Sequence, residues 1–473
     1  MQTYFATSKQ EKKMKAQLSA DDQKFREFSL NANMFRVILH VCIPLALYQS
    51  LTQLFKVFDT MIAAHISPMA ISSVAYIGQI QIMLSALGGG LAVGASIKVS
   101  EAYGAGNYEL VRRRVSTMVA LCACIAGTIL VFLLPSATVF LQFMKTPQEF
   151  IQIGSTYFRI ELIALAVTFF GNIYIAIERA RGNSKRILYL NMTIVISKLV
   201  LTAVFVYVFN FGINSIATAT LISQLIVLGA AVINMSKKDN LFSFSLKAIS
   251  FKSEIVNPML KLSFPVIIEK MAFAMGKVIV NAMCTTYGPK TVGALGISNN
   301  IGGITTMPQN GFQEGGSAVI SQNRGAGKLD RTLQAFYCEL LCNLILGITL
   351  MSASLAALEF LSRFFAGKDF EFQQMIKGIY IYESWGAIPL GINAAVLSLM
   401  YGFGKTKVTL FMNFCRIFLF RVPVLILLQK YTNFGSESAG IVMGVSNFLS
   451  GVLAVILGIF TISGIKKQIK QQA

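Results

Sequence analysis

Charged side chains are scarce in this chain of 473 residues. Asp, Glu, Lys and Arg make up 13% of the sequence, whereas hydrophobic residues make up 55%. A soluble domain needs roughly 25% charged residues to cover its surface, so much of this surface must face something other than water. Disorder and collagen-like repetition are excluded as well, because the apolar content is high and there are only 10 prolines.

Residues and motifs for enzymatic chemistry are also missing. The two histidines, His40 and His65, are too isolated to suggest a metal site. There is no Walker A lysine motif, no H-E-x-x-H and no G-x-S-x-G, so ATP hydrolysis and protease-type chemistry have no support. All seven cysteines fall in apolar stretches and are interpreted as small buried residues rather than a disulfide framework. We expect no enzyme, no metal and no cofactor.

Apolar stretches long enough to cross a bilayer recur about twelve times, each meeting the ~20 residues that a transmembrane helix needs. Runs such as LVLTAVFVYVF are typical of helices, since transmembrane strands show short alternating segments. The sequence predicts an all-α integral membrane protein with twelve transmembrane helices. The expected spans are residues 37–64, 72–98, 115–141, 152–178, 187–210, 213–235, 259–287, 291–321, 332–361, 376–402, 408–429 and 438–464.

Acidic residues are few as well, with 21 Asp and Glu against 41 Lys and Arg. In a soluble protein this excess would indicate nucleic-acid binding. With both termini placed in the cytoplasm, however, roughly 27 basic residues lie inside and about six lie in the opposite loops. This is the positive-inside asymmetry of multi-pass membrane proteins. We therefore expect a cell (inner) membrane protein with cytoplasmic termini and no nucleic-acid partner.

The N-terminal residues 1–30 are polar and lack the apolar core of a signal peptide. Two interpretations stay open for them. Met14, Leu18, Phe25 and Phe28 form the apolar edge of a basic helix lying on anionic membrane lipid, or the segment is a disordered tail.

An internal repeat divides the chain into halves. One constant shift along the chain aligns Pro44 with Pro265, Gly90 with Gly311, Gly94 with Gly315 and Gly104 with Gly325. A shift longer by a single position aligns Glu161 with Glu383 and Asn191 with Asn413. Six spans in each half give parallel repeats, and transporters built this way bind substrate between the repeats. We expect a tail at 1–36, an N-lobe at 37–235, a linker at 236–258, a C-lobe at 259–464 and a tail at 465–473.

Several motifs lie at matching positions of the two halves. VFDTMIAAHISPMAISSVAYIGQI and GGGLAVGASIKVSEAYGAGN lie in the first two spans, MPQNGFQEGGSAVISQNRGAGK lies in the eighth, and RGNSK and GFGKTK are loops. Together they resemble the signature segments of the multidrug and toxic compound extrusion (MATE) family, from about residue 36 to 464. The resemblance implies a bacterial carrier that exchanges H⁺ or Na⁺ for amphipathic, often cationic compounds. It also implies two pseudo-symmetric six-helix lobes around a V-shaped cavity.

The resemblance also suggests ion-coupling residues. Asp59 matches the first-helix Asp that the family uses for coupling, and Glu269 matches the acidic seventh helix of several bacterial branches. Where many members have Asn-x-x-x-Asp in the fifth helix, this chain has Lys198 and Thr202. That departure argues against a family-standard cation site in the N-lobe and favours H⁺ over Na⁺, with a Na⁺ site near Glu269 as the alternative.

Charges deep in a membrane span cost a few kcal/mol on insertion scales, so each is a functional candidate. Asp59 shares a polar stripe with Gln49, Thr52 and Lys56 at helical spacing. Either Lys56 and Asp59 pair only to neutralise each other, or protonation of Asp59 breaks the pair and biases the lobes. Lys198 is expected to face Asp59 or to snorkel towards the interface.

The C-lobe offers a similar set. Lys277 and Asn281 share a stripe on the seventh helix and are predicted to line the substrate cavity. The repeat-related Glu161 and Glu383 are predicted to do the same, unless both lie near the outer interface. For Glu269, the alternative to a coupling role is that it is a helix-end charge near the cytoplasmic interface.

Four further charges are interpreted as structural. Arg416 and Arg421 are expected to pack against carbonyl groups or Glu383 rather than to bind substrate. Glu178 and Arg179 are expected at a solvated helix end.

The sequence therefore predicts a secondary active efflux transporter. It would exchange H⁺ or Na⁺ for a small amphipathic organic compound by alternating access, as a monomer in membrane lipid. The alternative is a flippase or exporter of an anionic lipid-linked or peptidic natural product, because Lys56, Lys198 and Lys277 suit an anionic head group. A membrane enzyme or receptor has no catalytic cluster to support it.

Overall fold

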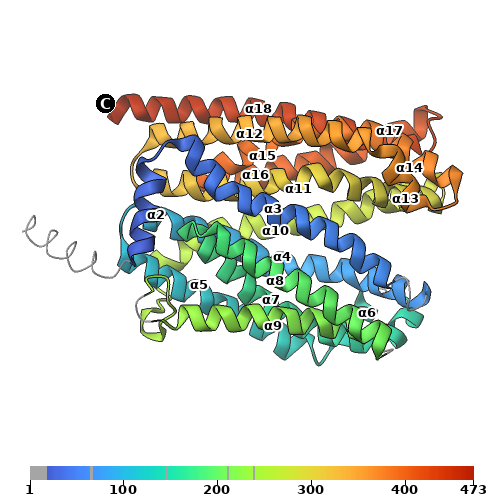
Figure 1. The fold of residues 1–473 in the computed structure, drawn as a ribbon, viewed down its shortest axis with the longest axis horizontal. Helices are drawn as coiled ribbons and strands as arrows, with labels where there is room; N and C mark the ends of the chain where they lie inside the picture. The colour runs from blue at the N-terminus through green and yellow to red at the C-terminus, as the bar shows by residue number, and fades with distance from the viewer. Residues whose placement is uncertain (1–18, 64–67, 145, 210–211, 238–239, 473) are drawn as a thin grey trace, which may run out of the picture.

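The computed structural model describes residues 19–63, 68–144, 146–209, 212–237 and 240–472, without the side chains of 20–21, 54–63, 68–75 and 472. Its first half contains α2 (Ala20–Asn31), α3 (Met34–Ala63), α4 (Pro68–Gly104), α5 (Tyr108–Thr128), η1 (Ile129–Leu133), α6 (Ala137–Phe143), α7 (Gln148–Arg181), α8 (Ser184–Ala203), η2 (Val204–Val208) and α9 (Asn214–Met235). After η3 (Leu246–Ala248), the second half contains α10 (Ser253–Cys284), η4 (Thr285–Tyr287), α11 (Pro289–Gly325), α12 (Leu329–Ala356), α13 (Leu358–Ala366), α14 (Phe370–Ser384), α15 (Ala387–Gly402), α16 (Thr406–Phe414), η5 (Cys415–Arg421), α17 (Val422–Tyr431) and α18 (Glu437–Gln472) (Figure 1).

Each predicted span corresponds to one long helix, or to helices continued through a π-helical turn or a bend. In the described part of the chain, nine helices are long and apolar enough to cross a membrane, or ten if α14 and α15, bent by 48°, form one span. Helices α10 and α11 match the predicted spans 259–287 and 291–321 and contain 32 and 37 residues. Their hydropathy is lower because they carry many of the polar residues that line the central cavity described below.

The two halves of the chain form two lobes, defined here as the N-lobe (α3–α9) and the C-lobe (α10–α18). Figure 1 shows α4–α9 in the lower half and α11–α18 in the upper half, with α3 and α10 where the halves meet. Across this boundary α3 packs against α11, and α4 packs against α10. The lobe interface is therefore built by the first two helices of each repeat.

Glycines allow the lobes to approach closely, and they do so symmetrically. A Cβ atom at Gly90 would lie 2.8 Å from the Cα of Ile267, and one at the repeat-related Gly311 would lie 2.5 Å from the Cα of Ala46. Ala46 and Ile267 are themselves related by the same shift along the sequence. Gly94 contacts Ser263 and Gly315 contacts Cys42 in the same reciprocal way. The pseudo-symmetry predicted from the repeat is thus present in the packing.

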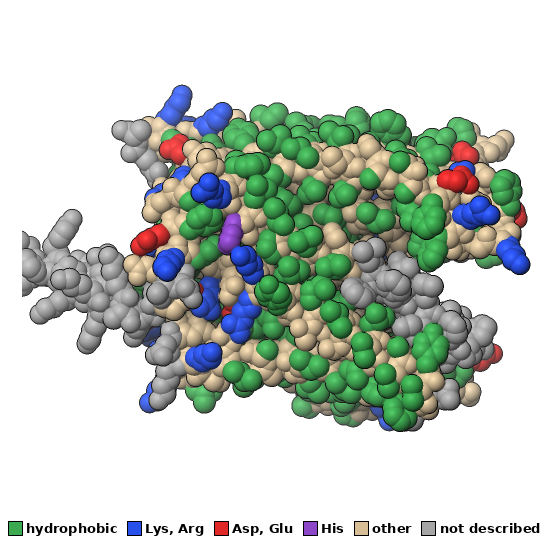
Figure 2. Space-filling model, in the orientation of Figure 1, with side chains coloured by type: hydrophobic (Ala, Val, Ile, Leu, Met, Phe, Trp, Pro, Cys, Tyr) green, Lys and Arg blue, Asp and Glu red, His purple; other side chains and the backbone are tan. Residues whose placement is uncertain are grey.

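Basic residues gather at one end of the bundle, called here the basic end. Figure 2 shows Lys and Arg side chains concentrated where α2 and the C-terminal part of α18 lie, with fewer at the opposite end beside α13 and α14. This distribution matches the charge asymmetry along the sequence.

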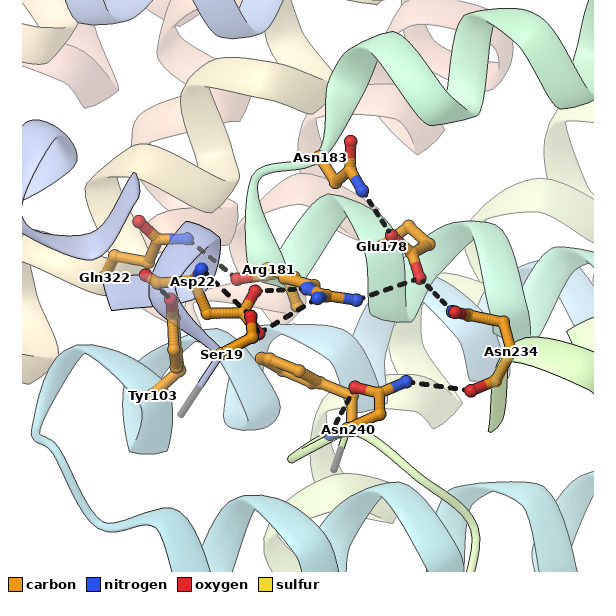
Figure 3. A network of polar contacts seen from close by, with 11 residues as sticks. Ser19, Asp22, Tyr103, Glu178, Arg181, Asn183, Asn234, Asn240 and Gln322 are labelled. Atoms are coloured by element: carbon orange, nitrogen blue, oxygen red, sulfur yellow. Dashed lines mark hydrogen bonds and ion pairs between the residues drawn. The ribbon is translucent and has the colours of Figure 1, made fainter. Parts of the chain in front are cut away.

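Helix α2 closes the basic end on the N-lobe side. The Ser19 side chain caps the helix by accepting a hydrogen bond of 3.2 Å from the Asp22 amide. The buried Asp22 carboxylate forms an ion pair with Arg181 of α7, and Tyr103 of α4 donates to the Asp22 carbonyl at 2.9 Å (Figure 3). Arg181 in turn lies 3.6 Å from Glu178.

The same helix also contacts the C-lobe. Ser29 donates to the Gln322 side chain of α11 at 2.7 Å, and Gln322 donates to the Ala180 carbonyl of α7 at 2.7 Å. Lys328, after α11, donates to the Leu30 carbonyl at 3.0 Å. Residues 20–31 are therefore a helix docked onto both lobes, which differs from both interpretations of the N-terminal segment; residues 1–18 lie outside the described chain.

Glu178 corrects a sequence expectation. The sequence predicts it at a solvated helix end, but its side chain is buried and accepts hydrogen bonds from Asn183 at 3.1 Å and Asn234 at 3.0 Å (Figure 3). Long-range packing of α7 against α9 removes it from water.

Candidate functional site

A cavity of about 1010 Å³ lies between the lobes. Helices α3, α4 and α7 of the N-lobe and α10, α11, α14, α15, α16, η5 and α18 of the C-lobe contribute lining residues. The cavity runs from Arg179 and Glu314 to Asn281 and Gly293, which lie near the opposite ends of their helices. Ligand pockets in proteins typically measure roughly 300–1,000 Å³, so this space is large enough for an organic molecule.

The cavity is closed at the basic end by backbone contact between the lobes. A Cβ atom at Gly104 would lie 2.0 Å from the Gln322 carbonyl oxygen, and one at Gly325 would lie 2.0 Å from the Glu101 carbonyl oxygen. Gly104 and Gly325 are repeat-related, as are Glu101 and Gln322. Beside this contact, an ion pair of 2.5 Å joins Arg179 of α7 to Glu314 of α11 across the lobes. Arg179 lies in the last turn of α7, as predicted, but the predicted solvated setting is wrong.

Glu269 of α10 is the most elaborately bonded carboxylate on the cavity wall. Its side chain is 8% exposed, and three neutral side chains surround it. Tyr401 of α15 donates to Oε1 at 2.7 Å, Asn413 of α16 donates to Oε1 at 2.8 Å, and Thr409 of α16 lies 2.7 Å from Oε2. Glu269 lies in the middle of α10, so it is not a helix-end charge.

The Thr409 hydroxyl allows this site to hold Glu269 with or without a proton. Thr409 Oγ1 lies 2.7 Å from Glu269 Oε2 and 2.9 Å from the Thr406 carbonyl oxygen, but a hydroxyl has only one proton to donate. When Glu269 is ionised, Thr409 donates to it. When Oε2 carries a proton, Glu269 donates to Thr409, and Thr409 donates to Thr406. Neither state leaves a polar atom of the pair unsatisfied.

The N-lobe has no matching carboxylate at this position. The repeat places Tyr48 opposite Glu269, Ile187 opposite Thr409 and Asn191 opposite Asn413. Asn191 donates to the Ile187 carbonyl of its own helix at 2.9 Å. The C-lobe alone therefore has a carboxylate in this pseudo-symmetric pair of sites.

The predicted N-lobe coupling residues are only partly described. Lys56 and Asp59 are on α3, but their side chains lie outside the described part of the structure. Helix α3 packs against α8, which carries Lys198, half-buried near the centre of the predicted fifth span, and Thr202, buried. Among the described residues, the Thr202 hydroxyl has no hydrogen-bond partner. The pairing of Lys198 with Asp59 stays a prediction.

The sequence predicts six cavity residues once Gln49 and Thr52 of the polar stripe are included with Lys277, Asn281, Glu161 and Glu383. The structure places four of them on the cavity wall: Gln49, Lys277, Asn281 and Glu383. Glu383 is buried and accepts a hydrogen bond from Ser298. The other two are not among the lining residues. Thr52 donates to the Tyr48 carbonyl at 3.0 Å, and Glu161 is buried within the N-lobe, where Gln81 donates to it.

Two arginines of the C-lobe, for which the sequence predicts a structural role, line the cavity. Arg416 donates to the Asn447 side-chain oxygen at 2.9 Å, and Arg421 donates to the same oxygen at 3.3 Å. Residues five apart in an α-helix point about 140° away from each other. In the π-helix η5, the Val422 N–H bonds to the Ile417 carbonyl five residues earlier. This wider turn lets Arg416 and Arg421, which are also five residues apart, point to the same side of the helix.

Some cavity residues gave little sequence signal. Gln53 donates to the Asn300 carbonyl across the lobes at 3.0 Å, although the predicted polar stripe on the first span does not include it. Tyr401 lies in an apolar run, and only the three-dimensional packing of both α15 and α10 against α16 brings it to Glu269. Asn413 stands out in the sequence because the repeat aligns it with Asn191, but the sequence alone assigns it no role.

Comparison with known proteins identifies related sequences. A family model described as MatE matches residues 44–208 and 265–427, one match in each lobe. The probable multidrug resistance protein YoeA of Bacillus subtilis (strain 168) is 24% identical over 389 residues, or 80% of this chain and 83% of YoeA. The probable multidrug resistance protein NorM of Thermotoga maritima is 22% identical over 414 residues, or 86% of this chain and 88% of NorM.

Solved structures share the fold. One is an outward-facing conformation of a multidrug resistance MATE family transporter of the MOP superfamily, with a TM-score of 0.89, 18% identity, and coverage of 95% of this chain and 99% of that chain. Another is a MOP superfamily transporter from Pyrococcus furiosus, with a TM-score of 0.87, 18% identity, and coverage of 93% and 98%. The predicted all-helical, two-lobed fold is thereby confirmed.

Proposed function

The chain belongs to the MatE family, and on that basis we propose that it exports a small amphipathic organic compound in exchange for H⁺, by alternating access between its two lobes. Members of this family are transporters, so the chain is a multi-pass membrane transporter and not an enzyme. The observation that carries the proposal is the buried Glu269 on the cavity wall, with partners suited to both of its protonation states.

Proton coupling requires a group that gains and loses H⁺ as the lobes move. Glu269 contacts α15 and α16 through Tyr401 and Thr409, so a change in its charge alters the bonds that hold three C-lobe helices together. Protonation removes the charge that these donors stabilise, and the conformational equilibrium shifts towards the lobe arrangement that tolerates a neutral acid.

We favour H⁺ over Na⁺ as the coupling ion. A hard cation needs several oxygen ligands. At Glu269, Asn413 directs its N–H group at Oε1, and both Tyr401 and Thr409 already lie at hydrogen-bond distance from the carboxylate. A Na⁺ ion would have to displace these contacts, whereas a proton only reverses the Thr409 bond.

The basic end is proposed to face the cytoplasm, with both termini, in the cell (inner) membrane of a bacterium. The cavity is then closed towards the cytoplasm and reaches towards the outside. Export would require the glycine contact at Gly104 and Gly325 to separate, opening the cavity to the cytoplasm. One chain supplies both walls of the cavity, so a monomer is sufficient.

Ion dependence of transport tests this proposal. Purified protein in liposomes should drive dye movement under an imposed pH gradient at fixed Na⁺, and an imposed Na⁺ gradient at fixed pH should add nothing. Liposomes without protein, tested under both gradients, serve as the control. Transport driven by Na⁺ alone would overturn H⁺ coupling while leaving the exporter assignment in place.

A further inference from the structure

Two cationic side chains on the C-lobe wall of the cavity lie over one aromatic ring, and a third lies beside them. The Lys277 ammonium lies 5.0 Å from the ring centroid of Phe273, and the Arg416 guanidinium lies 5.6 Å from the same centroid. Arg421 shares the Asn447 oxygen with Arg416. All three basic residues line the cavity. We call Lys277, Arg416 and Arg421 the cationic cluster.

The two arginines of this cluster are held by neutral groups. Arg416 donates to Asn447 through Nε at 3.2 Å and Nη2 at 2.9 Å, and Arg421 donates to Ser446 at 3.1 Å and to Asn447 at 3.3 Å. Within the described residues, neither guanidinium forms a salt bridge. Glu383 also lines the cavity and accepts a hydrogen bond from Ser298; its one negative charge interacts with Lys277, Arg416 and Arg421 and offsets only one of their three positive charges. Charges in a membrane span are costly unless compensated, so these two favour an anionic ligand.

The cavity lining as a whole also carries more positive than negative charge. Its described lining contains five basic residues, Arg179, Lys270, Lys277, Arg416 and Arg421, against three acidic residues, Glu269, Glu314 and Glu383. Glu314 is already paired with Arg179, and Glu269 is enclosed by its three neutral partners. The balance of charge on the wall is positive, which disfavours a cationic substrate.

We propose that the cationic cluster is an anion subsite and that the transported compounds are amphipathic organic anions. Their acidic group binds at Lys277 and Arg416, with Arg421 holding Arg416 in place through Asn447. Their apolar body packs against Phe273 and Met443, which line the same wall. This inference rests on the proposed transport function, but it concerns binding and not coupling.

Binding of two dyes with one ring system tests the inference. Purified protein in phosphatidylcholine nanodiscs is titrated into carboxyfluorescein, an anion, and into rhodamine 6G, a cation, with fluorescence anisotropy as the measurement. Carboxyfluorescein should bind more tightly. Arg416→Gln and Lys277→Gln should each weaken its binding by about tenfold, since each removes a charge-assisted contact. Lys290→Gln, on an exposed lysine outside the cavity, is the matched control.

Retained folding is checked with a charge-preserving variant. Arg416→Lys keeps a cation and should keep the preference for carboxyfluorescein, even if Arg416→Gln proves poorly folded by size-exclusion chromatography. Tighter binding of rhodamine 6G than of carboxyfluorescein in the unmodified protein would overturn the anion subsite. So would carboxyfluorescein binding unchanged by both cluster variants.

A second experiment, with anionic lipid in the nanodiscs, distinguishes a lipid head group from a soluble compound as the anion bound at the cationic cluster. In nanodiscs containing phosphatidylglycerol, competition against carboxyfluorescein would assign the subsite to an anionic lipid head group. Binding unchanged by phosphatidylglycerol would assign it to soluble amphiphilic anions. Because no gradient is present, failure of H⁺ coupling leaves this test intact, and loss of the anion preference leaves the coupling proposal intact.

Discussion

At the scale of single residues, Glu269 and its neighbours differ from other buried carboxylates of the molecule. Glu339 of α12 is fully buried and bonded by Ser398 at 2.6 Å, but it does not line the cavity. Glu269 combines burial with access to the cavity and with a hydroxyl partner that can reverse its bond. A coupling group needs both features, because the proton must reach it and both protonation states must be accommodated.

Glu269→Gln should remove the pH response of transport. Glutamine keeps the shape and some of the hydrogen bonds of the protonated acid but cannot release a proton. We expect H⁺-driven dye transport in liposomes to fall by about tenfold or more, as for loss of a group that handles a proton. Glu339→Gln is the matched control and should keep the pH response. If the control lost the response and Glu269→Gln kept it, coupling would belong to the Glu339–Ser398 pair.

Asp59 gives a second prediction, which depends on the sequence alone. Asp59→Asn should abolish transport without lowering expression, because it removes the proposed first-helix coupling charge. The double variant Lys56→Gln/Asp59→Asn separates the two interpretations of that pair. It should remain inactive if Asp59 couples transport, and it should recover activity if the two residues only neutralise each other. Dye efflux from cells, normalised to membrane expression, is the measurement.

At this scale, the sequence identified several of the polar residues of the site but not the side chains that surround them. Glu269, Lys277 and Asn281 stood out because charge and amide groups are rare in apolar spans. Tyr401 and Thr409 did not, because hydroxyl groups are common in helices and their role depends on which helix packs beside them. The shared orientation of two arginines five residues apart depends on a π-helical turn, which hydrophobic periodicity does not reveal.

At the scale of elements, α2 joins the lobes at the basic end. It contacts the N-lobe through the pair of Asp22 with Arg181 (Figure 3) and the C-lobe through the hydrogen bond from Ser29 to Gln322. The apolar spans could be predicted because each shows its own pattern. The docking of α2 could not, because its partners lie far away along the chain and none of them is unusual in composition.

Asp22→Ala should loosen α2. The change removes both Asp22 contacts with Arg181. A hydrogen bond to a charged group contributes about 1.5–3 kcal/mol, and breaking a buried ion pair costs about 3–5 kcal/mol. Losing both contacts should therefore lower the opening free energy of α2 by about 3–5 kcal/mol. Amide hydrogen exchange across residues 22–31 is the measurement, with Lys24→Ala, an exposed position of the same helix, as the control. Equal exchange in the two variants would show that the ion pair does not hold α2 in place.

At the scale of the whole molecule, the internal repeat and the lobe interface describe the same symmetry. The glycines that the repeat aligns are those that let each lobe contact the other's backbone, from Gly90 and Gly311 to Gly104 and Gly325. Two similar halves related in this way can rock against each other. Besides the glycine contacts, they share buried apolar side chains such as Ile38 of α3 and Phe312 of α11, which the motion must accommodate. The sequence predicted this symmetry, but it could not say that the interface would be closed at the basic end.

Gly104→Ala should therefore shift the molecule towards an arrangement open at the basic end. The added methyl group would overlap the Gln322 carbonyl oxygen, which is 2.0 Å from the Cβ position. Overpacking of this kind typically costs about 1–3 kcal/mol, so the closed population should drop about tenfold relative to the open one. Spin labels at Glu109→Cys and Asp330→Cys, in a background without native cysteines, report the separation of the lobes at this end.

The repeat supplies a second variant for the same measurement. Gly325→Ala should act in the same way by symmetry, because its new Cβ would overlap the Glu101 carbonyl oxygen. Gly229→Ala, where no atom lies within 4 Å of the new Cβ, should leave the distance distribution unchanged. An unchanged distribution in both interface variants would show that the glycine contact does not control closure.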